Sequence, residues 1–186
     1  MHPRILAIAT IAAATFALPV YGNHSHTEEF HATFSGFNEV GGLGAGETGA
    51  ILSGGTARLR LDLDRGAQTL KYRLTFSGLG SAVTQSHIHF GKVHTAGGVM
   101  VFFCSNLATA PAGVQPCPAD GGTVSGTITA ANVLPLAGQN VPAGDFDALV
   151  EALTSDTAYA NIHTTNFPAG EIRGEVRRGD GDDDRD

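Results

Sequence analysis

The architecture is indicated most clearly by residues 57–76, which read ARLRLDLDRGAQTLKYRLTF. In its first half, apolar residues at 57, 59, 61 and 63 alternate with charged residues. A second alternation runs from Leu70 to Phe76, after the turn signal Asp64-Arg65-Gly66. Period-two alternation places apolar side chains on one face of a strand and polar side chains on the other. The stretch therefore predicts an antiparallel hairpin with one dry face and one wet face.

Short strands continue through the rest of the chain, separated by glycine-rich turns. We expect them at 30–37, 85–90, 98–104, 123–130, 158–163 and 171–177, with the apolar run 98–104 in the centre of a sheet. One segment differs, because its apolar residues recur at helical spacing and Asp145 precedes them as a cap. The sequence thus predicts an all-β protein, a Greek-key β-sandwich or barrel with one short helix at 145–153.

The two ends of the chain suggest an exported protein. One positive charge and an apolar run from Ile5 to Val20 predict a signal peptide over 1–22, with an uncleaved anchor as the alternative. Residues 23–177 then form a single β domain, and 178–186 form a disordered acidic tail. The formal charge of −7 argues against nucleic acid as a partner. We expect a secreted or periplasmic protein that makes no membrane contact after cleavage.

The chain has two cysteines, Cys104 and Cys117. In an exported protein they predict a disulfide that pins the proline-containing loop between them. A thiolate metal ligand is the alternative, which an oxidising compartment disfavours.

Histidines provide the candidate chemistry. His87 and His89 are two apart on an expected strand, so both rings point to one face, and His163 lies on a later strand. Imidazole suits copper, zinc, iron or nickel, and we expect copper with zinc as the alternative. The site requires the three rings to converge within about 4 Å, since metal–nitrogen bonds are near 2 Å. His94 is a candidate fourth ligand, or else an ordinary loop histidine.

Arg173 follows a turn expected at 166–170, which would return it to the neighbourhood of the His163 strand. Its guanidinium can attract an anion toward a metal and so serve catalysis. The alternative is a structural arginine paired with Glu171, Glu175 or another carboxylate. The sequence contains no G-x-S-x-G and no H-E-x-x-H motif that would compete as a catalytic site.

Several blocks resemble the CHRD domain, the module first recognised in chordin and widespread in bacterial secreted proteins. The resemblance covers most of residues 30–177, and its most specific part is the C-terminal block. The matching blocks are Phe37-Asn38-Glu39-Val40, 86–91 (SHIHFG), 158–164 (AYANIHT) and 167–174 (FPAGEIRG). A departure is the glycine-rich 41–43, where family members often carry prolines. In chordin these domains belong to an extracellular antagonist of growth factors, which implies binding rather than catalysis.

A weaker resemblance is to the copper-zinc superoxide dismutases, Greek-key barrels with an H-x-H, a late histidine and a following arginine. It implies that His87, His89 and His163 ligate copper and that Arg173 guides an anion. The chain lacks a second His and Asp cluster for zinc, so the resemblance implies a copper-only site at most.

Two functions follow as hypotheses. The first is a copper-binding protein with a three- or four-histidine mononuclear site and superoxide dismutase-like activity, for which superoxide would be the substrate. The second is a non-enzymatic extracellular interaction or structural module. Strand edges could also pair two copies into a homodimer.

Overall fold

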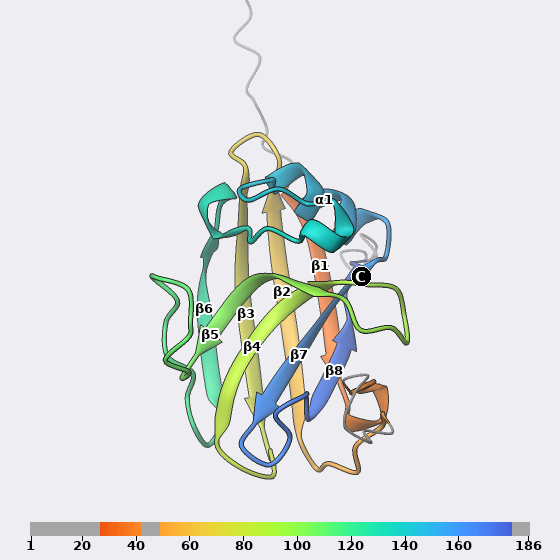
Figure 1. Ribbon diagram of the computed structural model, residues 1–186, viewed down its shortest axis with the longest axis vertical. Helices are drawn as coiled ribbons and strands as arrows, with labels where there is room; N and C mark the ends of the chain where they lie inside the picture. Colours follow the sequence, from red (N-terminus) through yellow and green to blue (C-terminus); the bar gives the residue numbers. More distant parts are fainter. Residues whose placement is uncertain (1–26, 42–48, 180–186) are drawn as a thin grey trace, which may run out of the picture.

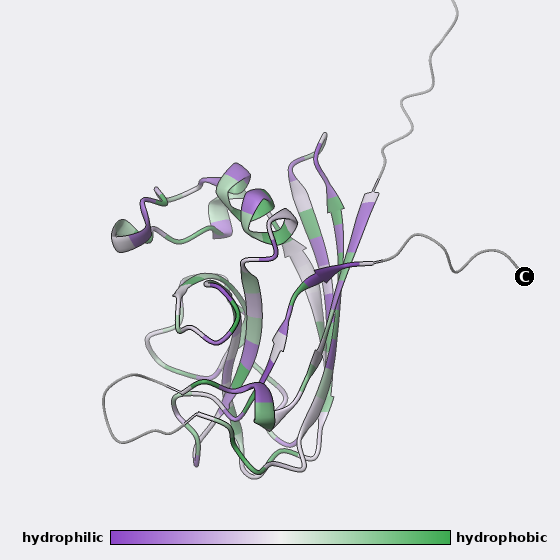
Figure 2. Cartoon of the chain, turned by 90° about the vertical axis from the view of Figure 1, so that its right-hand side faces the viewer, coloured by the Kyte–Doolittle hydropathy of each residue, from purple (hydrophilic) through white to green (hydrophobic). Residues whose placement is uncertain are grey.

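The computed structural model describes residues 27–41 and 49–179, which fold into two antiparallel sheets packed face to face (Figures 1 and 2). The first sheet has the order β6-β3-β2-β1-β9 and the second β5-β4-β7-β8. The strands are β1 (Thr27–Phe34), β2 (Thr56–Asp64), β3 (Thr69–Ser77), β4 (Val83–Phe90), β5 (Gly98–Ser105), β6 (Gly122–Ile128), β7 (Ala158–Thr164), β8 (Ile172–Glu175) and β9 (Arg177–Arg178). The expected β-sandwich is confirmed, and the described strands do not close into a barrel.

The hairpin of β2 and β3 forms the middle of the first sheet, as its alternation predicts. The two strands pair in continuous register from Thr56 opposite Ser77 to Asp64 opposite Thr69. Their apolar side chains, including Leu61, are buried against the second sheet, whereas the charged side chains face outward. Burying a leucine contributes roughly 1.5–3 kcal/mol, so this row is a principal source of the hydrophobic stabilisation.

Helix α1 (Phe146–Thr154) covers one end of the sandwich (Figure 1). Asp145 caps it, because its carboxylate accepts a hydrogen bond from the Ala148 N–H at 2.9 Å. Short 3₁₀ turns occupy Gly36–Asn38, Ala130–Asn132 and Ala137–Gln139. The predicted helix is confirmed to within one residue at each end. Among the described residues, no helix has the length and apolar character needed to cross a membrane.

Two strand predictions need correction at their ends, apart from the expected strand 123–130, which stops early at Ile128. β1 stops at Phe34, three residues before the expected end, because the Ser35 side chain accepts from the Phe37 N–H and starts a 3₁₀ turn. The expected strand 171–177 divides at Val176, so that β8 and β9 belong to different sheets. Arg178 lies in β9, within the range assigned to the acidic tail. The two sheets thus share the last segment of the chain.

A third correction concerns β5, which is an edge strand and not a central one. The strand can be apolar although it lies at an edge, because groups from other segments cover its outer side. The Leu134 N–H donates to the Met100 carbonyl at 2.9 Å, and the Tyr72 hydroxyl donates to the Phe103 carbonyl at 2.9 Å. An edge covered in this way needs no charged residues to prevent strand pairing with another chain.

Cys104 and Cys117 form the predicted disulfide, which joins the end of β5 to the following loop. The signal peptide (1–22) and most of the tail (180–186) lie outside the described residues, so those two predictions stay predictions.

Candidate metal centre

Three histidines meet on the outer face of the second sheet. His87 and His89 come from β4, and His163 comes from the adjacent strand β7. They are 2%, 8% and 6% exposed, and their ligand nitrogens all lie within 4.8 Å of one another. A tetrahedral ion with bonds of 2.0–2.1 Å needs ligand nitrogens about 3.3 Å apart. The 4.8 Å limit is wider than the 4 Å expected from the sequence.

The Nδ1 atoms of two of these rings are already occupied by backbone carbonyls. His89 Nδ1 lies 2.8 Å from the Gly97 oxygen, and His163 Nδ1 lies 2.8 Å from the Pro168 oxygen. A carbonyl oxygen only accepts, so both Nδ1 atoms carry the proton. The Nε2 atoms of the neutral rings therefore carry lone pairs that can bind a cation. Metal-ligating histidines are oriented in this way in most known sites.

His87 completes the cluster from the side of β5. Its Nδ1 is buried and has no hydrogen-bond partner, and its ring contacts the ring of Phe102 edge-on at 5.0 Å. The ring centroids of His89 and His163 each lie 4.6 Å from that of His87. A buried ring nitrogen without a partner costs free energy unless an ion or a water satisfies it. This orphaned nitrogen fits a metal ligand.

Burial keeps all three rings neutral near pH 7. It lowers the pKa of His89 to about 4, although the hydrogen bond to Gly97 opposes the shift. Burial also places the pKa of His87 well below its usual range, and the neighbouring His89 and His163 lower it further. The pKa of His163 is lowered for the same principal reason. Protons therefore compete weakly with a metal for these nitrogens at neutral pH.

Asn161 lies at the centre of the site, although the sequence reasoning assigned it no role. It is 2% exposed and pairs across the sheet with His87 on one side and with Arg173 on the other. Its Oδ1 is 3.1 Å from His89 Nε2 and 3.1 Å from His163 Nε2. The alternation of β7 already places Asn161 on the face of His163, so its two-residue spacing from that histidine was the available signal.

A stack of three planar groups holds the His89 ring in place. The Tyr159 ring lies parallel to the His89 ring at 4.5 Å, and the Arg173 guanidinium lies 3.3 Å from the centre of the Tyr159 ring. Stacking of this kind adds to the burial free energy of the rings. The plane of His89 is thus set both by this stack and by the Gly97 carbonyl.

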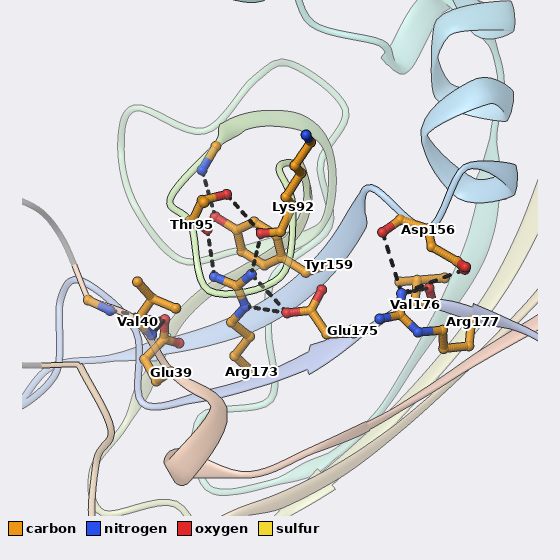
Figure 3. Close-up of polar contacts among 12 residues, drawn as sticks. Glu39, Val40, Lys92, Thr95, Asp156, Tyr159, Arg173, Glu175, Val176 and Arg177 are labelled. Carbon is orange, nitrogen blue, oxygen red and sulfur yellow. Dashed lines mark hydrogen bonds and ion pairs between the residues drawn. The ribbon is translucent and has the colours of Figure 1, made fainter.

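Arg173 is 1% exposed, and its guanidinium is fully engaged (Figure 3). It forms an ion pair with Glu175 at 2.8 Å and donates to the carbonyl oxygens of Thr95 and Lys92. The ion pair with Glu175, which the sequence analysis gave as the alternative role of Arg173, is therefore present. Glu171 is not a partner, because its carboxylate accepts from Ser53, Gly80 and Thr164. The anion-guiding role of Arg173 stays a prediction.

His94 does not join the other three histidines. It is exposed in the loop between β4 and β5, in the left-handed conformation with φ of 62°. The same loop supplies the Gly97 carbonyl to His89 and two carbonyls to Arg173. The loop therefore covers the site with main-chain atoms, while the side chain of His94 stays outside the cluster of ligand nitrogens.

Glu39 is a second buried group that the sequence reasoning left without a role. It is 5% exposed, and one carboxylate oxygen accepts from the Val40 N–H at 3.0 Å. Burial raises its pKa, and the backbone N–H groups of Val40 and Gly41, followed by the charge of Arg173, lower it in part. Figure 3 shows Glu39 beside Arg173. An acidic group thus faces the site from the segment that follows β1.

The protein is thus an antiparallel β-sandwich with a three-histidine cluster buried on the outer face of one sheet. The CHRD domain model matches residues 30–176, and the chain belongs to the CHRD family. A search of curated proteins and a search of solved structures gave no match to this chain. CHRD domains are extracellular modules, and the disulfide between Cys104 and Cys117 fits an oxidising compartment.

Proposed function

We propose that this protein is a secreted or periplasmic copper-binding protein with a mononuclear site at His87, His89 and His163. The observation that carries the proposal is the arrangement of the ring nitrogens. Backbone carbonyls hold the Nδ1 protons of two rings, so that lone pairs on Nε2 converge in a buried space. The third ring adds a buried nitrogen, His87 Nδ1, that has no hydrogen-bond partner.

Copper is proposed over zinc for two reasons. A site of imidazoles binds Cu(II) more tightly than the other divalent first-row ions, according to the Irving–Williams order. The predicted export also separates the protein from the thiols that bind copper in the cytosol. Bound copper would supply one-electron redox chemistry, while the chain's own residues orient the rings and limit access of water.

The test is metal analysis of the full-length protein after incubation with CuSO₄ or ZnSO₄ and removal of excess metal. We expect one copper per chain and a copper-dependent rise in melting temperature, since an ion bound only to the native state adds RT ln(1 + [L]/Kd) to stability. The variant H87A/H89A/H163A should lose both effects. H94A is the matched control and should retain them, because that ring lies outside the cluster.

Equal copper content in the wild type and the triple variant would refute the site, and the interaction or structural module would then be the better description. One zinc per chain with no copper would refute the choice of metal alone.

Superoxide dismutase-like activity is a further prediction that the same preparation tests. Catalysis needs an open coordination position, whereas binding alone does not. The three rings are buried, and the Arg173 guanidinium is directed at Glu175 and two carbonyls. These contacts favour a copper carrier or buffer. Copper-loaded protein that does not accelerate superoxide decay would support that role, and turnover lost in the triple variant would support an enzyme.

A further inference from the structure

We propose that the side-chain oxygen of Asn161 is a fourth ligand of the metal, which makes the centre a closed three-nitrogen, one-oxygen site. This inference rests on the proposed function, because it concerns the same ion. Asn161 lies between His87 and Arg173 in the sheet and directs its amide toward the two Nε2 atoms.

The first argument is the location of protons. His89 and His163 each carry their proton on Nδ1, where a backbone carbonyl accepts it. Their Nε2 atoms therefore present lone pairs to Asn161 Oδ1, which also presents lone pairs. The oxygen lies within hydrogen-bonding distance of both nitrogens, and there is no hydrogen to share. A cation between them converts this repulsion into coordination.

The second argument is distance. The Oδ1 atom is 3.1 Å from each Nε2 atom. Two ligands of one tetrahedral ion, with bonds near 2.0–2.2 Å, stand about 3.3 Å apart. The oxygen is therefore already near the position of a ligand, and no change of rotamer is needed to bring it there.

The third argument is the orientation of the amide, in which oxygen and nitrogen can exchange places. The structure places Oδ1, and not the amide nitrogen, 3.1 Å from both Nε2 atoms. The oxygen therefore faces the two histidines, and the NH₂ group points away from them. The opposite orientation would place the NH₂ group between the two Nε2 atoms, where it would obstruct a metal.

The experiment compares Cu(II) affinity of the full-length protein, measured by competition with a chelator, across substitutions of one residue. Asn161→Leu has similar volume but no oxygen, and we expect its affinity to fall at least tenfold. Asn161→Asp keeps an oxygen at the same place and should bind at least as tightly as the wild type. The EPR spectrum of the Leu variant should differ from that of the wild type, since one donor atom to the copper would have changed.

Ser86→Ala is the matched control, because it removes a buried hydrogen bond to the Asn161 main chain and leaves the ring cluster untouched. It should keep wild-type affinity. Tighter binding by Asn161→Leu would overturn the proposal and show that the amide obstructs the metal. Unchanged affinity and EPR spectrum in Asn161→Leu would overturn the fourth ligand while the three-histidine site stands. Failure of the wild type to bind either copper or zinc would overturn both.

Discussion

Acid should destabilise the metal-free protein through His89, and the size of the effect follows from its burial. The ring has a pKa of about 4 in the folded protein, against 6.5 as the reference value. The unfolded chain therefore binds a proton between these two values while the folded chain does not. Because the folded pKa is the lower one, the free energy of unfolding decreases as pH falls through this window. The full contribution is about 3 kcal/mol, and about 2 kcal/mol is lost by pH 5.

Neighbouring groups add to or oppose this effect. His87 and His163, whose pKa values are also lowered by burial, act in the same direction. Glu39 acts in the opposite direction, because burial raises its pKa and protonation then favours the folded state. Arg173 faces the ring through Tyr159 and disfavours its charged form. A single substitution is needed to separate the contribution of His89 from these groups.

The assay is urea unfolding of EDTA-treated protein at intervals from pH 7.5 to pH 4.5, in the wild type and in His89→Gln. Glutamine can still donate to the Gly97 carbonyl but cannot titrate. We expect the variant to have a flatter pH dependence, with about 2 kcal/mol less loss of stability by pH 5 than the wild type. His31→Gln, on the exposed face of β1, is the control and should follow the wild type. Equal slopes in the wild type and His89→Gln would refute the argument from burial.

Two further predictions concern stability. Arg173→Met should lower the free energy of unfolding by about 3 kcal/mol, because it removes the buried ion-pair partner of Glu175 and the donor to the Thr95 carbonyl. Arg60→Met, an exposed ion-pair variant, should cost less than about 1 kcal/mol by the same urea assay, and equal losses would contradict the structural role of Arg173. Replacing Cys104 and Cys117 with serine should cost about 3 kcal/mol, because the disulfide closes a loop of about 14 residues in the unfolded chain. A melting temperature equal to that of the oxidised wild type would count against this loop-entropy estimate.

The sequence predicted those parts of the candidate site that depend on the alternation of side chains along a strand. Alternation places His87 and His89 together on the outward face of one strand. It likewise places Asn161 and His163 together on the outward face of another strand. The structure brings the two pairs together because β4 and β7 are neighbours in one sheet. The disulfide and the helix were likewise predictable, since each depends on local spacing and chemistry. His94 had no such constraint, because the direction of a loop side chain depends on the fold of the loop.

The amino-acid pattern alone predicts which side chains enter the core of the sandwich and which histidines lie on the opposite face. That prediction follows from the two-residue repeat of an extended chain, a property of neighbouring residues alone. The position of β5 at an edge and the division of the last segment between two sheets came only from the three-dimensional arrangement. It also decided that backbone carbonyls of Gly97 and Pro168 hold the ring protons. These features depend on contacts between distant segments. Backbone carbonyl groups are the same at every residue, so the amino-acid sequence does not indicate which of them will accept a hydrogen bond.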